Sequence, residues 1–169
     1  MKILKAYIAQ SADGYIAYPD GDLNWIPEII RKDFIERYNS ADILILGSTT
    51  YREVIERSGL WNYNSKETYV VSKFNTNVSE SQNVRFLTDN PMKQIKKIKS
   101  ASNGDIIVMG GGKLVESLIS NNLLDELVLI IIPTELGDGI PFFPDLNTME
   151  LSEERVMQGI ITKTYQSMI

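Results

Sequence analysis

The sequence predicts an α/β protein with a mostly parallel central sheet and a C-terminal antiparallel hairpin. Apolar runs of strand length alternate with amphipathic helical patterns along residues 3–133, and most connections between them are short. Two further strand-like runs flank Gln158-Gly159 with no helical pattern between them, so we expect a hairpin from Val156 to Met168. A chain of 169 residues with 43% hydrophobic residues suits a single domain spanning residues 1–169.

The expected strands are apolar runs bounded by turn-forming residues. The first, ILKAYIA at 3–9, stops before the turn signal Ser-Ala-Asp-Gly. The segment DILILG at 42–47 is apolar after its first residue and ends in Gly47, as expected of a strand buried on both faces. The same criteria predict further strands at 67–72, 83–88, 105–109 and 124–133.

The expected helices combine apolar residues at helical spacing with start signals. In the segment 26–40 the apolar side chains form one stripe, and Pro27 stands near the start. Further helices are expected at 49–57 after a threonine cap, at 90–100 with Asn90 as the cap, and at 112–122. The lysine-rich stretch 93–99 has apolar residues between its lysines, which favours the solvated face of a helix over a nucleic-acid site.

The composition excludes several kinds of chemistry. The chain has no cysteine and no histidine, so disulfides, thiol nucleophiles, the usual zinc sites and histidine acid/base catalysis are excluded, and we expect no metal. Proton transfer must use Asp, Glu, Lys, Tyr or water. With a net charge of −5, no apolar run of membrane-span or signal length, and no dense basic patch, we expect a cytoplasmic protein without membrane or nucleic-acid partners.

Three consecutive glycines, Gly110 to Gly112, stand where a predicted strand passes into a predicted helix. The surrounding VMGGGKL lacks the spacing of a P-loop and of a Rossmann fingerprint. A glycine-rich turn at a helix N-terminus presents backbone N–H groups and positive potential, so an anionic group such as a pyrophosphate could bind there. A tight turn that only lets helix and sheet pack closely is the alternative.

Small or polar residues also follow the other predicted parallel strands. Ser-Ala-Asp-Gly follows the first strand, Gly47 and a threonine-rich helix start follow the second, and Ser72-Lys73 follows the third. The carboxyl ends of parallel strands share one edge, where open sheets bind their ligands. The ligand interpretation of the glycine run therefore gains support.

Taken together, these segments resemble the dihydrofolate reductase-like superfamily. The matching pieces are SADGYIA, NWI, ILILGSTTY, VVSK, VMGGGKLVESLI, LLDEL and PTELGDGIPFF, which occur in the family's order over almost the whole chain. The closest branch is the reductase domain of the bifunctional riboflavin-biosynthesis deaminase/reductase, with its stand-alone homologues. The resemblance implies a three-layer dihydrofolate reductase-like fold, NADPH as cofactor, a homodimer, and a cis peptide bond between Gly110 and Gly111.

The resemblance also implies which residues bind the cofactor. The glycine run and the helix start after Gly47 would meet the phosphates, Ser72 and Lys73 would lie by the 2′-phosphate, and Ala9 and Ile16 would flank the nicotinamide. Dihydrofolate reductases carry a basic residue where this chain has Ser48, which leaves Lys73 as the nearby cation. The full set is Ala9, Ile16, Gly47, Ser48, Thr49, Thr50, Ser72, Lys73, Gly110, Gly111, Gly112, Lys113 and Leu114.

Candidates for the chemistry are fewer. Asp13 matches the acidic position of the riboflavin-pathway branch, although an Asp-Gly turn former is the alternative. Glu28 and Asp33 are carboxylates of the first helix that could simply be solvated. Trp25 could stack on a heteroaromatic substrate or pack in the core. Gly137, Asp138 and Gly139 belong to a region that borders the substrate pocket in the family, or form a plain surface loop.

Three functions remain open at this point. The first is an NADPH-dependent reductase of the riboflavin-pathway type, similar to 5-amino-6-(5-phosphoribosylamino)uracil reductase, acting on a pyrimidine or pterin-like heterocycle. The second is a true dihydrofolate reductase. An alignment through Pro27 disfavours it, because Ile29 stands where those enzymes carry a carboxylate. The third is a nucleotide-binding protein without catalysis.

Overall fold

The computed structural model describes residues 3–58, 63, 66–73 and 83–169. Within these ranges one large sheet has the strand order β5-β4-β3-β6-β1-β7-β10-β9, and β2 pairs with β8 in a small second sheet. The large sheet is built from β1 Leu4–Ser11, β3 Ile43–Gly47, β4 Glu67–Val71, β5 Val84–Leu87, β6 Ile106–Gly110, β7 Glu126–Ile132, β9 Met149–Met157 and β10 Ile160–Ser167. The small sheet is built from β2 Tyr15–Ala17 and β8 Ile140–Pro141. The helices are α1 Glu28–Ser40, α2 Ser48–Ser58, α3 Pro91–Ala101 and α4 Gly112–Ser120.

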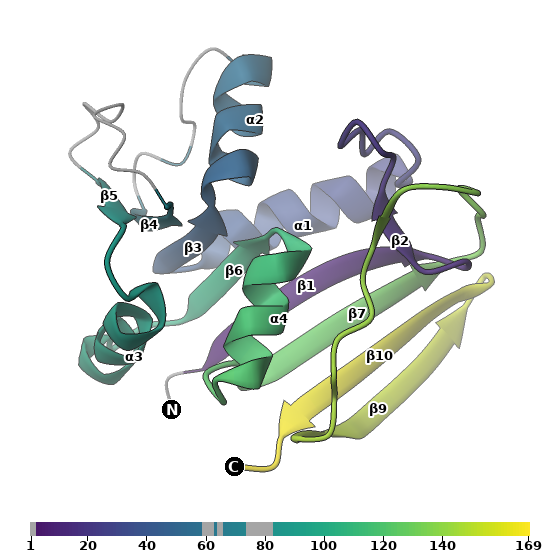
Figure 1. Cartoon of the computed structure of the whole chain (residues 1–169). Coiled ribbons are helices and arrows are strands. Elements are labelled where there is room, and N and C mark those ends of the chain that lie inside the picture. The colour runs from purple at the N-terminus through teal and green to yellow at the C-terminus, as the bar shows by residue number, and fades with distance from the viewer. Residues whose placement is uncertain (1–2, 59–62, 64–65, 74–82) are drawn as a thin grey trace.

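The strand directions confirm the predicted fold class. All pairings from β5 across to β7 are parallel, whereas β10 pairs antiparallel with both β7 and β9. Because the parallel strands share one direction, the carboxyl ends of β1, β3, β4 and β6 meet at one edge of the sheet (Figure 1). The strand β7 lies between β1 and β10, so the apolar LVLIIIP stretch is an internal strand.

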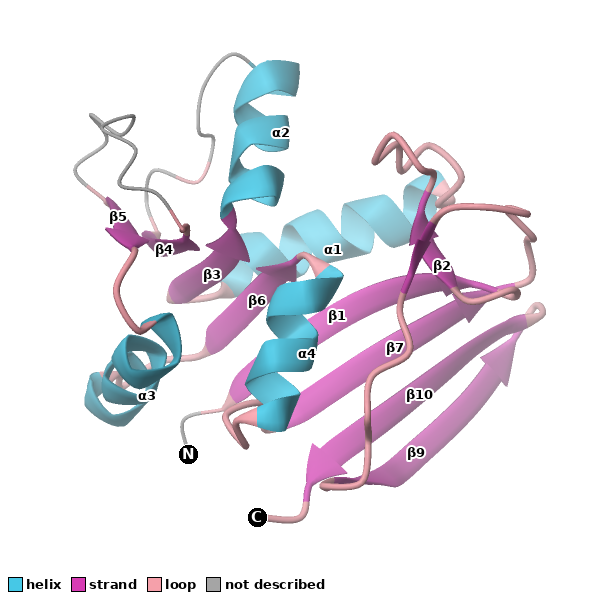
Figure 2. Ribbon diagram, in the orientation of Figure 1, coloured by secondary structure: helices cyan, strands magenta, loops and turns pink. Residues whose placement is uncertain are grey.

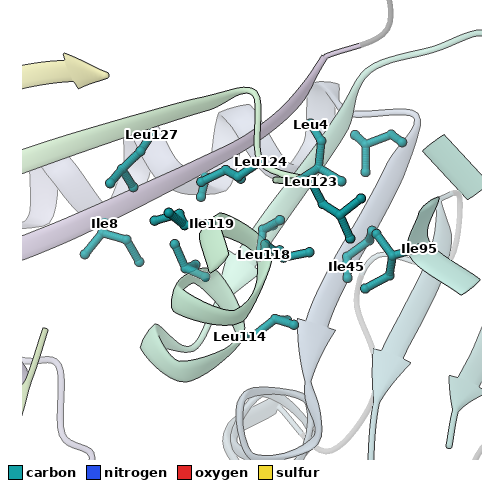
Figure 3. Packing of buried hydrophobic residues seen from close by; sticks show 14 of the residues in the cluster. Leu4, Ile8, Ile45, Ile95, Leu114, Leu118, Ile119, Leu123, Leu124 and Leu127 are labelled. Atoms are coloured by element: carbon teal, nitrogen blue, oxygen red, sulfur yellow. The ribbon is translucent and has the colours of Figure 1, made fainter. Parts of the chain in front are cut away.

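Helices cover both faces of the parallel part of the sheet. Figure 2 shows α3 and α4 on one face, with α1 crossing behind the strands on the other. From α4, the side chains of Leu114, Leu118 and Ile119 belong to the buried cluster that also contains Ile8 and Ile45 (Figure 3). This stripe explains why the segment is a helix, since its apolar positions recur at helical spacing and bury one face.

Several elements differ from the sequence prediction. The second helix begins at Ser48, so Thr49 and Thr50 lie inside it and neither is the predicted cap. The short strands β2 and β8 are not predicted from the sequence. The hairpin begins at Met149 rather than Val156, because β9 is exposed on both faces from Glu150 to Met157 and therefore carries no apolar alternation. The first helix begins at Glu28 rather than Ile26, with Pro27 as its N-cap. Among the described residues, no helix is both long and apolar enough to cross a membrane.

Candidate functional site

The two helices that follow β3 and β6 begin beside each other. These strands are hydrogen-bonded neighbours, and α2 begins at Ser48 and α4 at Gly112, each directly after its strand. A Cβ atom added to Gly47 would lie 3.9 Å from the backbone N of Gly111. Two helix N-termini with their positive ends therefore meet at the glycine run. Neither helix has an acidic side chain in its first turn to compete for an anion.

Each glycine of the run has a different structural reason. Gly110 has φ +124, a conformation that favours glycine. A Cβ on Gly112 would lie 2.8 Å from Ile16 Cδ1 and 3.1 Å from Phe142 Cδ2, so this glycine lets three segments pack together. Gly111 has φ −87 and ψ −174, which any residue adopts, and its added Cβ would meet only Thr50 Oγ1, at 3.9 Å.

Gly111 differs from the other two glycines, because neither its φ nor its packing requires a glycine. Its added Cβ would lie at ordinary van der Waals distance from Thr50 Oγ1, where the α4 N-terminus has no side-chain cap. The first N–H groups of a helix have no partner inside that helix, so they could bind an anion at this point. The packing explanation accounts for Gly112 but not for Gly111. The Gly110–Gly111 peptide bond is cis, as the resemblance implies.

Other residues predicted to bind the cofactor lie on β1, on β2 and directly after β4. Ile16 on β2 reaches Gly112, whereas Ala9 is buried on the α1 face of the sheet with Ile130. Ser72 follows β4 and is 7% exposed, and its N–H donates to the Leu87 carbonyl at 3.2 Å. Lys73 is exposed and forms no ion pair with a described residue.

A cavity of about 570 Å³ lies between β5 and α3, next to the strand that receives the Ser72 hydrogen bond. Arg85, Lys93 and Lys97 line it, together with Asp89 and Tyr69. Lys93 and Lys97 are four residues apart on α3, so they belong to the lysine-rich stretch expected to be a solvated face. They are further cations at the β4–β5 end of the molecule.

Asp13 accepts three hydrogen bonds. Its Oδ1 accepts from Ser11 Oγ at 2.6 Å and from the Leu136 N–H at 3.1 Å, and its Oδ2 accepts from the Gly137 N–H at 2.8 Å. The hydrogen bond from Ser11, supported by those from Gly137 and Leu136, holds the pKa of this carboxyl below its usual value. The arrangement favours an ionised acceptor over a proton donor.

The two helix carboxylates form ion pairs within α1. Glu28 pairs with Lys32 at 3.1 Å, and both side chains are exposed. Asp33 pairs with Arg37 at 2.8 Å, and this guanidinium stacks over the Tyr7 ring with its Cζ 4.6 Å from the ring centroid. Each carboxylate is thus engaged on the helix surface, which fits the solvated alternative.

Trp25 packs against the core group of Ala9, Ile26, Ile130 and Ile132. Its indole Nε1 is buried and has no hydrogen-bond partner among the described residues. A buried N–H without a partner costs about 1–3 kcal/mol.

Two residues that the sequence reasoning missed, Glu53 and Arg57, line a cavity of about 230 Å³ with Asp20, Gly21, Asp22 and Asn24. Burial raises the pKa of the Glu53 carboxyl, although Arg57, 3.8 Å away, opposes the shift. The loop after β2 contacts α2 here, since a Cβ on Gly21 would lie 2.9 Å from Glu53 Oε1. No local sequence signal predicts that contact, because the two segments are far apart in the chain.

The family model described as the RibD C-terminal domain matches residues 2–161. The uncharacterized protein YwjB of Bacillus subtilis (strain 168) is 30% identical over 143 residues, which cover 83% of this chain and 82% of YwjB.

Solved structures agree with that match. A protein of Shewanella sp. PV-4 with a provisional assignment to riboflavin biosynthesis superposes with a TM-score of 0.80 and 25% identity, over 99% of both chains. Dihydrofolate reductase of Enterococcus faecalis complexed with NADP(H) superposes with a TM-score of 0.73 and 22% identity, over 99% of this chain and 97% of that one. The second likeness bears on the fold alone, and it confirms the dihydrofolate reductase-like architecture.

Proposed function

Because the chain belongs to the RibD C-terminal domain family, we propose that it is an NADPH-dependent reductase of the riboflavin-pathway type. The observation that carries the proposal is the meeting of the α2 and α4 N-termini at Gly111, the one glycine of the run that neither packing nor a positive φ requires. An anionic, extended cofactor suits two adjacent helix N-termini. The NADP(H) complex of the structurally similar dihydrofolate reductase supports the same cofactor.

In this proposal the chain binds the cofactor mainly through its backbone. The glycine run with Lys113 and Leu114, and the segment from Gly47 to Thr50, hold the phosphates. Ile16 stands at Gly112 and limits the position of the reactive ring. The cofactor supplies the hydride, so the protein's part is orientation and the exclusion of water.

The substrate half of the site is formed by Trp25 and by the cavity between the loop after β2 and α2. The Glu53 carboxyl, whose pKa is raised by burial, is the proton source of this half. The Asp20, Asp22 and Glu53 carboxylates outnumber the single guanidinium of Arg57. Charge repulsion therefore supports a pyrimidine or pterin-like substrate that places no phosphate in this cavity.

A dihydrofolate reductase is less well supported. Ile29, which aligns with the carboxylate of those enzymes, is 74% exposed, and its neighbour Glu28 is paired with Lys32 on the helix surface. The first turn of α1 thus offers no buried carboxylate to a pterin ring.

The test is NADPH oxidation, measured as the loss of NADPH absorbance, with each compound of a matched panel of candidate substrates. The panel holds a ribosylaminopyrimidine with and without its 5-phosphate, and dihydrofolate. We expect turnover of the unphosphorylated pyrimidine to exceed that of its phosphorylated form. NADPH oxidation with dihydrofolate and with neither pyrimidine would establish the dihydrofolate reductase alternative. Tight NADPH binding without turnover of any compound would support the non-catalytic alternative.

We also propose a homodimer, which the resemblance implies. The dimer cannot form by strand pairing along the LVLIIIP stretch, because β7 is enclosed between β1 and β10. Light scattering should give twice the chain mass of 19.1 kDa at micromolar concentration. A mass equal to one chain would contradict the dimer.

A further inference from the structure

Two segments far apart in the sequence are joined along the edge of the candidate site. The first runs from Gln10 to Ala17 and the second from Thr134 to Phe143. Ala12 N–H donates to the Thr134 carbonyl at 2.9 Å, and Phe142 N–H donates to the Gly14 carbonyl at 3.1 Å. The buried amide of Gln10 donates to the Phe142 carbonyl at 2.6 Å. The pairing of β2 with β8 completes the connection.

Asp13 stands at the middle of this connection. Its carboxylate receives the backbone N–H groups of Leu136 and Gly137 from the second segment and the hydroxyl of Ser11 from the first. Ser11 is 1% exposed, and its Oγ also accepts the Tyr15 N–H at 2.9 Å, so its own hydrogen is directed to Asp13. All the surrounding groups donate, which leaves the carboxylate as an acceptor only.

Both joined segments reach the same point of the glycine run. An added Cβ on Gly112 would lie 2.8 Å from Ile16 of the first segment and 3.1 Å from Phe142 of the second. Phe142 is fully buried there, whereas Ile16 is half-buried. A change in how the two segments pair would therefore move the side chains that border the cofactor position.

We propose that Asp13 is a positioning residue, and not the proton donor: its carboxylate fastens the 134–139 segment to the turn after β1 and thereby sets Ile16 and Phe142 against the glycine run. The proposal rests on the proposed reductase function for its consequence, but the fastening itself is a property of the free protein. The lowered pKa of Asp13 agrees with it, because a carboxyl that stays ionised has no proton to give.

Asp13→Asn tests the proposal with little change in shape. The amide keeps one acceptor oxygen but turns an NH2 group toward a donor, so at least one of the bonds to Leu136 and Gly137 is lost. Glu135→Gln is the matched control, since it removes one carboxylate from the same segment and this exposed side chain has no described hydrogen bond or ion pair. Ser11→Ala is a milder second variant that keeps the carboxylate and both backbone bonds.

The first measurement is amide hydrogen exchange at Leu136 and Gly137 by NMR, on the free protein. Asp13→Asn should speed exchange at these amides about tenfold, in line with the loss of one hydrogen bond to a charged group. Ser11→Ala should have a smaller effect and Glu135→Gln none. Unchanged exchange in Asp13→Asn would overturn the fastening, whether or not the protein is a reductase. If Asp13→Asn does not fold, the wild type decides: amides of Leu136 and Gly137 that are not protected from exchange in the free protein overturn the fastening.

The second measurement separates positioning from proton donation. Asp13→Asn should weaken NADPH binding about tenfold while turnover at saturating NADPH stays within about threefold of the wild type. Loss of turnover with NADPH affinity unchanged would make Asp13 the proton donor and overturn the proposal. If no compound is reduced by the wild type, the proposed function fails, and the exchange data still decide the role of Asp13.

Discussion

The glycine run and the Asp13 turn hold the two sides of the candidate site by opposite means. At the glycine run the chain has no side chains, and the backbone N–H groups of two helix ends lie side by side. At the Asp13 turn one side chain accepts hydrogen bonds from three donors. Under the proposed function the first region binds an anion from the cofactor, whereas the second holds an anionic side chain of the protein itself.

The largest expected effect is a loss of stability from truncating a core side chain of α4. Leu118 is fully buried under α4, and Leu118→Ala should lower the free energy of unfolding by about 2–5 kcal/mol. Thermal denaturation should shift down by about 5–15 °C, and NADPH binding should weaken with it. Leu151→Ala on the half-exposed face of β9 is the control and should melt within about 2 °C of the wild type.

The next effect separates the glycines from one another. Gly112→Ala should cost about 1–3 kcal/mol of stability, because its Cβ meets Ile16 and the buried Phe142 ring. Gly111→Ala should weaken NADPH binding at least tenfold, because its Cβ would lie where the cofactor is proposed to bind. It should lower the melting temperature much less, because that Cβ meets the protein only at ordinary van der Waals distance. Calorimetric binding and melting curves measure both. Normal binding by Gly111→Ala would mean that the run serves packing alone.

A smaller effect concerns the cations at the other end of the cofactor. Lys73→Ala should weaken NADPH binding by about 1 kcal/mol and leave NADH binding unchanged, because only NADPH carries the 2′-phosphate. Lys93→Ala is the matched comparison from the cavity between β5 and α3. If Lys93→Ala produces the loss and Lys73→Ala does not, the 2′-phosphate lies in that cavity instead.

The smallest effect is a pH dependence of stability at Asp13. Its folded pKa is lowered from a model-compound value of 3.8. The group therefore contributes stability above that value, and the contribution disappears as the pH falls through the folded pKa. The melting difference between wild type and Asp13→Asn should be constant from about pH 6 to 8 and shrink below about pH 4. A difference that already disappears well above pH 4 would mean that the pKa of Asp13 is not lowered in the folded protein.

The glycine run could be predicted because its logic is local. A strand pattern, a glycine run and a helix pattern follow one another, and parallel strands bring Gly47 and Gly110 to one edge. The alternation of strands and helices likewise predicts the sheet. The start of β9 at Met149 could not be predicted, because an exposed strand shows no apolar alternation.

The Asp13 turn and the Glu53 cavity depend on contacts between distant segments. Asp13 accepts hydrogen bonds from the backbone N–H groups of Leu136 and Gly137. Because almost every residue has such a group, the amino-acid sequence does not indicate which of them bind Asp13. Glu53 faces Gly21 only because the loop after β2 folds onto α2. The sequence could identify Asp13 as a candidate, but it could not distinguish an acceptor bound to a loop from a proton donor.

The long exposed strand β9 has a consequence for the behaviour of concentrated solutions. It ends the sheet order, so one side of its backbone is an open edge of the kind that pairs with other chains. Three of its residues, Glu150, Glu153 and Glu154, are acidic and one, Arg155, is basic, so the strand has a net charge of −2. Glu153 pairs with Arg155 and Glu154 with Lys163, and the remaining negative charge opposes the approach of a second copy of the same edge. This edge is thus protected by charge, and a strongly acidic or high-salt buffer, which weakens that repulsion, favours self-association along it.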